Sequence, residues 1–138
     1  MKGALIGCGF FAQNHLHAWR DIVGVEIVAI CDSDPARLKA TSVAFGISRT
    51  YEDAAQMFVE LDFDFVDIAT TVGSHRALVE MAANAGVDII CQKPFSETMM
   101  AARAKVAAGK IAGKTLIVHD NFRGLSPIQA ALEVVKSG

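Results

Sequence analysis

Three small residues near the start of the chain have the spacing of a loop that binds phosphate. Gly7, Gly9 and Ala12 form a G-x-G-x-x-A pattern directly after the apolar run at residues 3–6. The first glycine permits a tight turn, the second lets the backbone approach a pyrophosphate, and the small third residue lets a helix pack closely on a strand. Free N–H groups at the start of that helix attract anions. We therefore predict a dinucleotide phosphate site at Gly7, Gly9, Phe10, Phe11 and Ala12.

An acidic residue follows the second apolar run, at residues 26–31. Asp32 comes 23 residues after Gly9. A carboxylate at this place accepts hydrogen bonds from the adenosine ribose hydroxyls and repels a 2′-phosphate, which predicts NAD rather than NADP. NADP stays the alternative, because Arg37 would pair with a 2′-phosphate if its side chain folded back. Ser33 and Arg37 join Asp32 as predicted cofactor-binding residues.

Three later apolar runs, at residues 65–69, 87–90 and 116–118, also end in polar residues. In a doubly wound sheet, ligands bind outside the carboxyl ends of the strands. We expect these residues to converge on the nicotinamide end of the cofactor. The predicted cofactor-binding residues here are Thr70, Thr71, Val72, Gly73, His75, Gln92, Lys93, Pro94 and Asn121. For His75 a structural hydrogen bond at a helix start is the alternative.

The elements that must position these residues alternate along the chain. Short, nearly continuous apolar runs predict buried parallel strands at 3–6, 26–31, 65–70, 87–91 and 115–119, with a shorter strand near 48–50. Segments of helical periodicity separate them. Right-handed crossovers then predict an α/β fold with a doubly wound parallel sheet, the Rossmann fold. We expect residues 1–138 to form a single three-layer α/β/α domain.

Several helix boundaries can be predicted from local sequence. Asp34-Pro35 is a typical start, and Gly86 is a typical stop. Thr50-x-x-Asp53 has the pattern of a capping box, and apolar residues with helical spacing follow it from Ala54. Ser126-Pro127 predicts a last helix.

Composition excludes several classes of protein. Of the 138 residues 52% are hydrophobic, which rules out a disordered chain. The net charge of −2 provides no electrostatic footprint for nucleic acid, so we expect no nucleic-acid partner. No run approaches the ~20 apolar residues of a membrane span, so we expect no membrane partner. Three cysteines without a C-x-x-C pair predict free thiols in a reducing cytoplasm and no metal site.

Together these motifs resemble the glucose–fructose oxidoreductase / inositol dehydrogenase / MocA family (Gfo/Idh/MocA). The resemblance covers essentially the whole chain, but only the N-terminal Rossmann half of the family's members. Its most specific element is the Lys-Pro pair. The motifs that carry it are the glycine pattern with His15, Asp32, Thr71-x-x-x-His75, Gln92-Lys93-Pro94 and Asn121-x-Arg123.

The resemblance implies an oxidoreductase that moves hydride between a nicotinamide and a carbinol or carbonyl carbon of a sugar, cyclitol or related polyol. Lys93 would be the catalytic residue, beside the nicotinamide and the reacting carbon, where its cation would stabilise a developing alkoxide. The Lys93–Pro94 peptide bond is often cis in the family. Gln92 replaces the family's usual glutamate, and Thr71-Val72-Gly73 replaces Thr-Pro-Asn, so the loop under the nicotinamide loses a proline and an amide.

Family members continue into a second domain that holds the substrate pocket and the oligomer interface. Nothing in these 138 residues matches it. We expect the chain to bind cofactor weakly by itself and to turn over little. We also expect it to expose an apolar patch, or to bury that patch as a homo-oligomer.

Two other functions fit the sequence. One is a free-standing module that senses NAD(H) without chemistry. The other is a methyltransferase that uses S-adenosylmethionine, although Ala12 and the Lys93-Pro94 pair argue against it.

Overall fold

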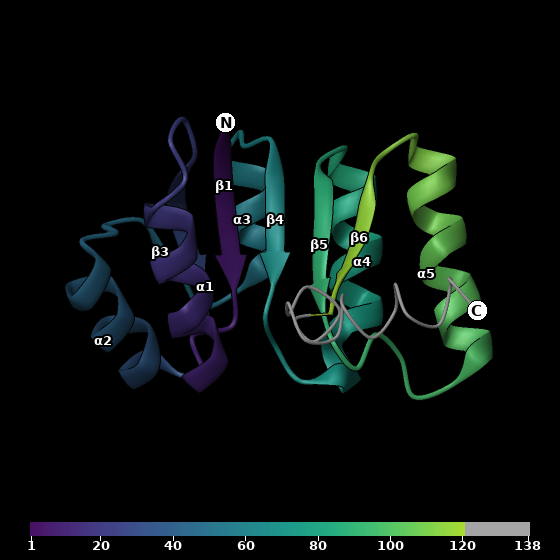
Figure 1. Cartoon of the computed structure of the whole chain (residues 1–138), viewed down its shortest axis with the longest axis horizontal. Helices are drawn as coiled ribbons and strands as arrows, with labels where there is room; N and C mark the ends of the chain where they lie inside the picture. The colour runs from purple at the N-terminus through teal and green to yellow at the C-terminus, as the bar shows by residue number, and fades with distance from the viewer. Residues whose placement is uncertain (121–138) are drawn as a thin grey trace, which may run out of the picture.

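The structure, a computed structural model, describes residues 1–120 of the chain, and its centre is a six-stranded parallel sheet (Figure 1). The strand order is β3-β2-β1-β4-β5-β6, and every pair of neighbours is parallel. The strands are β1 (Lys2–Ile6), β2 (Glu26–Cys31), β3 (Thr50–Tyr51), β4 (Phe65–Ile68), β5 (Asp88–Gln92) and β6 (Leu116–His119). This arrangement confirms the predicted doubly wound sheet.

Helices cover both faces of the sheet. In Figure 1, α1 and α2 lie in front of it, while α3 and α4 lie behind it and α5 stands beside α4. Right-handed crossovers explain the two layers, because the chain runs outward in opposite directions from β1 and from β4. The helices are α1 (Phe10–Arg20), α2 (Pro35–Phe45), α3 (Ala54–Glu60), α4 (Val72–Ala85) and α5 (Met99–Ala112).

The pleat of the strands divides the core in two. Leu5 of β1 packs with residues of α1 and α2 in one cluster, whereas its neighbours Ala4 and Ile6 pack with residues of α3 and α4 in the other. Successive side chains of a strand point to opposite faces, so a continuous apolar run buries both. The predicted three-layer α/β/α arrangement follows from these two clusters.

The helix boundaries agree with the sequence at some ends and differ at another. Asp34 caps α2 by accepting hydrogen bonds from the backbone of Ala36 and Arg37, and Gly86 ends α4 in the left-handed conformation. The predicted capping box is wrong. Thr50 belongs to β3, paired with Ile30, and Asp53 is the cap of α3. The strand β3 begins two residues later and ends one residue later than predicted.

An apolar groove lies beside the edge strand β6. Apolar side chains of α1, β5 and β6 line it on the α1 side of the sheet, and Ile117 and Val118 of β6 are exposed. That another domain or a second copy of the chain covers this groove stays a prediction.

Among residues 1–120, no helix is long and apolar enough to cross a membrane. The predicted last helix, Asn121 and Arg123 lie outside the described residues.

Candidate functional site

A cavity of about 530 Å³ opens at the carboxyl ends of β1, β2 and β4. This is the place where the strand order reverses direction, the position at which doubly wound sheets bind ligands. Its volume lies within the roughly 300–1,000 Å³ typical of small-molecule sites. The predicted residues that line it are Gly7, Gly9, Phe10, Phe11, Asp32, Ser33, Arg37, Thr70 and Thr71.

The glycine loop has the geometry that its sequence predicts. Gly7 has φ +98°, and a Cβ built on it would lie 2.9 Å from the backbone of Ala69, directly after β4. Gly9 has φ −72°, and no atom would lie within 4 Å of its Cβ. Ala12, in the first turn of α1, is fully buried against the sheet. The first glycine is therefore needed by the fold, whereas the second leaves space beside the cavity.

The start of α1 is free to receive an anion. Gly9 is its N-cap residue, no side chain caps the helix, and no acidic residue lies in the first turn. Unpaired N–H groups and the positive end of the helix dipole attract phosphate. The residues of this loop therefore fit the pyrophosphate of a dinucleotide.

Alanine substitutions at the two glycines should separate folding from binding. Gly7→Ala is expected to lower the melting temperature, because the left-handed conformation costs a non-glycine residue about 1–2 kcal/mol and the new methyl would meet Ala69. Gly9→Ala is expected to keep the melting temperature and to weaken NAD binding, since its methyl fills space needed by phosphate. Thermal unfolding and calorimetric titration check both. Unchanged NAD affinity in Gly9→Ala would contradict the phosphate site.

Asp32 ties the loop to the end of β2. It is 8% exposed, and its Oδ2 accepts a hydrogen bond of 2.6 Å from the backbone N–H of Cys8. Its Oδ1 accepts a hydrogen bond of 2.8 Å from the backbone N–H of Asp34. Carboxylate oxygens have further lone pairs, so ribose hydroxyls can still be accepted. The sequence indicated the ribose contact but not this anchoring of the loop.

Arg37 lies at the rim of the cavity between two carboxylates. Its Nε donates to Oδ2 of Asp34 at 3.0 Å, and its Nη2 lies 3.9 Å from Oδ1 of Asp32. The backbone and side-chain hydrogen bonds from Arg37 hold the pKa of Asp34 below its usual value. The carboxylates of Asp34 and Asp32 already neutralise the positive charge of Arg37, which a 2′-phosphate would need as its partner. This arrangement supports the prediction of NAD over NADP.

The loop after β4 forms the second wall. Thr70, Thr71 and Ser74 line the cavity, and the hydroxyl of Ser74 lies 2.7 Å from Oγ1 of Thr70 and 2.9 Å from the carbonyl of Thr71. His75 is fully buried, and its Nε2 donates to the carbonyl of Thr70 at 3.0 Å. His75 therefore holds the backbone of Thr70 in place from the buried side of this loop. Val72, in the first turn of α4, does not line the cavity.

Gly73 also stands in the first turn of α4, outside the cavity lining. The direct contacts predicted from Val72, Gly73 and His75 to a cofactor stay predictions.

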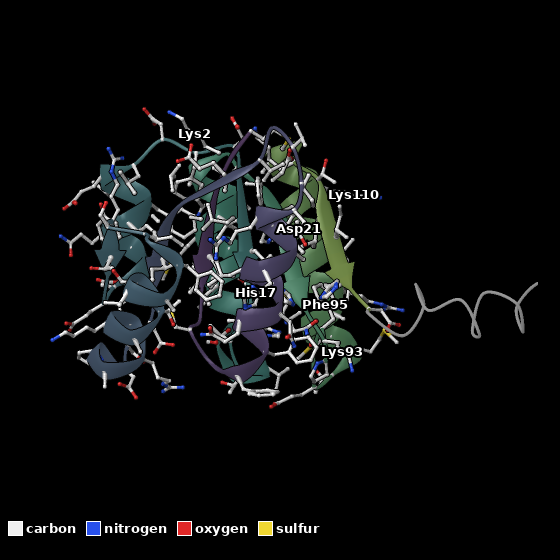
Figure 2. The ribbon with its side chains drawn as sticks, turned by 60° about the vertical axis from the view of Figure 1, so that its left-hand side comes forward. Lys2, His17, Asp21, Lys93, Phe95 and Lys110 are labelled. Atoms are coloured by element: carbon white, nitrogen blue, oxygen red, sulfur yellow. The ribbon has the colours of Figure 1, made fainter. Side chains whose placement is uncertain are left out.

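The residues after β5 lie at the same edge of the sheet but outside the cavity lining. Figure 2 shows Lys93 and Phe95 together at the end of the molecule opposite to Lys2, where β1 begins. The Lys93–Pro94 peptide bond is cis, as the resemblance implied. Lys105 of α5 is fully buried and donates to the carbonyl of Phe95, and burial lowers its pKa. A buried cation thus holds the segment that follows Lys93.

Sequence reasoning missed some residues of the cavity. Glu52, directly after β3, and Ser74 and Leu78 of α4 also line it. Glu52 follows a strand end, so the rule that located the other walls would have found it. Cys31 is also part of the lining.

The three thiols are poor nucleophiles at neutral pH. Burial raises the pKa of Cys8 and Cys91 to about 11 and that of Cys31 to about 12. Within residues 1–120, no group of three or more histidine, cysteine or acidic side chains is placed to hold a metal ion.

Comparison with known proteins agrees with this geometry. A model of the oxidoreductase family with an NAD-binding Rossmann fold matches residues 1–120. The chain is 61% identical to a D-apiose dehydrogenase of Paraburkholderia graminis over 137 residues, which are 99% of this chain and 36% of that protein. It is 58% identical to a D-apiose dehydrogenase of Rhizobium rhizogenes, with 100% of this chain and 40% of the relative covered. The chain thus spans about two fifths of these relatives.

Solved structures extend the likeness to the backbone. An oxidoreductase from Agrobacterium radiobacter, in complex with NAD⁺, L-tartaric acid and magnesium, matches with a TM-score of 0.95 and 58% identity, covering 100% of this chain and 40% of that one. A WlbA dehydrogenase from Chromobacterium violaceum, in complex with NADH and UDP-GlcNAcA, matches with a TM-score of 0.94 and 28% identity, covering 99% and 40%. The chain belongs to the Gfo/Idh/MocA oxidoreductase family, as its NAD-binding Rossmann domain.

Proposed function

We propose that this chain is the cofactor-binding part of an NAD-dependent dehydrogenase that oxidises a carbinol carbon of a sugar or polyol. D-apiose is the first substrate to test. The observation that carries the proposal is the 61% identity to a D-apiose dehydrogenase along nearly the whole chain. At the level of the site, the uncapped start of α1 and the strand-end carboxylate of Asp32 support it.

Different residues of the cavity would bind different parts of the cofactor. The loop at Gly7–Ala12 would bind the pyrophosphate, Asp32 would bind the adenosine ribose, and Thr70 and Thr71 would line the path to the nicotinamide. The chemistry that bound NAD would supply here is a hydride acceptor, at its nicotinamide. The protein itself then has to bind and orient the substrate and stabilise its charge.

Lys93 is the residue we assign to that charge. Its ammonium group would donate a hydrogen bond to the substrate hydroxyl and stabilise the negative oxygen that develops as hydride leaves the adjacent carbon. The remaining three fifths of the relatives' length would supply the substrate pocket and the acid/base partner of Lys93.

Titration of the chain with NAD, NADP and S-adenosylmethionine tests the proposal. A ligand that binds only the folded state stabilises it by about 2.7 kcal/mol at a hundred times its Kd. We expect NAD to raise the melting temperature most. A response to S-adenosylmethionine alone would overturn the proposal. NAD binding without turnover of D-apiose or other polyols by the full-length protein would favour the NAD(H)-sensing module.

Two properties of the whole protein complete the proposal. We place it in the cytoplasm, because Cys8, Cys31 and Cys91 are all buried free thiols. We also expect the apolar groove beside β6 to be covered in the whole protein, by the remaining chain or by a second copy. Light scattering of this chain and of the full-length protein distinguishes the two.

A further inference from the structure

Gln92, the last residue of β5, holds the backbone of its neighbour Lys93. The Gln92 side chain is 6% exposed, and its Oε1 accepts a hydrogen bond of 3.0 Å from the backbone N–H of Lys93. The same oxygen lies 3.1 Å from Nδ1 of His119, at the end of the neighbouring strand β6. Residues 92 and 119 are direct partners in the sheet. One amide oxygen therefore joins two strand ends beside the proposed catalytic lysine.

The chemistry of these three groups determines the state of the histidine. A backbone N–H can only donate, so the Gln92 atom that it meets is the oxygen. That oxygen can only accept, so Nδ1 of His119 must carry a proton. Burial and the nearby His15 lower the pKa of His119, which favours the neutral ring. His119 is therefore the Nδ1–H tautomer.

Buried contacts hold the His119 ring in place. It meets the ring of His15 edge-on, with 4.6 Å between the ring centroids. His15 in turn pairs with the buried Asp67 through a 2.8 Å contact from Nδ1 to Oδ2, and the indole N–H of Trp19 donates to the same carboxylate oxygen at 2.7 Å. The ring that orients Gln92 is thus tied to α1 and β4, which also carry the walls of the cavity.

We propose that Gln92 is a positioning residue that, with His119, sets the direction in which the Lys93 side chain leaves β5. This inference rests on the role proposed above for Lys93. Both donors, the Lys93 N–H and His119 Nδ1, share the single Oε1 atom, so the arrangement requires a side chain with an acceptor oxygen at position 92.

Two measurements on this chain test the positioning without any turnover. In ¹⁵N NMR spectra, His119 is expected as the Nδ1–H tautomer, and Gln92→Ala is expected to abolish that preference. Hydrogen exchange of the Lys93 amide is expected to become at least tenfold faster in Gln92→Ala. Gln56→Ala, which removes an exposed glutamine paired with Glu60, is the control and should change neither. An Nδ1-unprotonated His119, or unchanged exchange at Lys93, would overturn the proposal.

Turnover of the full-length protein tests the consequence for the reaction. Gln92→Ala is expected to lower kcat about tenfold, the loss of about 1.4 kcal/mol, and to leave KM for NAD within twofold. Gln92→Glu keeps an acceptor for both donors and should restore most of the rate. His119→Phe keeps an aromatic ring but loses the N–H donor, and its kcat is expected to fall as in Gln92→Ala. It replaces Gln92→Ala in this test if that variant folds poorly. Equal losses in Gln92→Ala and Gln92→Glu would overturn positioning through the acceptor.

The two proposals fail separately. If Lys93 variants keep full activity, the role assigned to Lys93 falls, while the NMR and exchange results still decide whether Gln92 and His119 hold its backbone.

Discussion

Replacing Lys93 with methionine is expected to lower kcat of the full-length protein by about 10²–10⁴-fold, the usual contribution of a positioned acid–base group. Methionine keeps the length of the side chain and removes its charge. The developing alkoxide would then lose its hydrogen-bond donor. NAD binding to this chain should change little, because Lys93 lies outside the cavity that holds the predicted phosphate and ribose contacts. Steady-state kinetics and calorimetric titration measure the two effects.

Lys110→Met provides the matched control for this experiment. Lys110 is an exposed lysine in the last turn of α5, and Figure 2 shows it away from Lys93, toward the other end of the sheet. The same change of charge there should leave kcat and NAD affinity as in the unmodified protein. A Lys93→Met protein with full kcat would contradict the catalytic assignment. A large loss of NAD affinity in that variant would instead place Lys93 in the cofactor site.

Asp32→Ala is expected to weaken NAD binding by roughly 10–100-fold, because hydrogen bonds to a charged group contribute about 1.5–3 kcal/mol. NADP binding should fall less, since the substitution also removes the repulsion of a 2′-phosphate and releases Arg37 from one of its two carboxylates. Part of the loss will be common to both cofactors. That part comes from the hydrogen bond between Asp32 and the Cys8 N–H, which anchors the glycine loop.

The loop and ribose contributions of Asp32 can be separated. Asp53→Ala likewise removes a carboxylate that accepts a backbone hydrogen bond, at the cap of α3, and Asp53 does not line the cavity, so it controls for charge and stability. Hydrogen exchange at Cys8 reports on the loop. Equal losses of NAD and NADP affinity in Asp32→Ala would show that Asp32 only anchors the loop and does not face the ribose.

Much of the fold follows from local sequence. The apolar runs that became β1, β2 and β4 are buried on both faces, so hydrophobicity alone locates them. Asp34-Pro35 and Gly86 act through their own backbones and neighbours, and both mark true helix ends. The capping-box pattern at Thr50 failed because pairing with Ile30 drew Thr50 into the sheet. A tertiary hydrogen-bond ladder there overrode a local capping preference.

The amino-acid sequence by itself determined the glycine loop after β1 and the carboxylate at the end of β2, because glycine conformation and strand ends are local properties. Only the tertiary structure decided how polar groups from distant segments pair. It joined Asp32 to the glycine loop and brought Gln92 to His119. Such contacts depend on strand order and register, which bring together residues 24 and 27 positions apart in these two pairs. No local pattern records that distance, so the partners of the site residues emerge only once the sheet has formed.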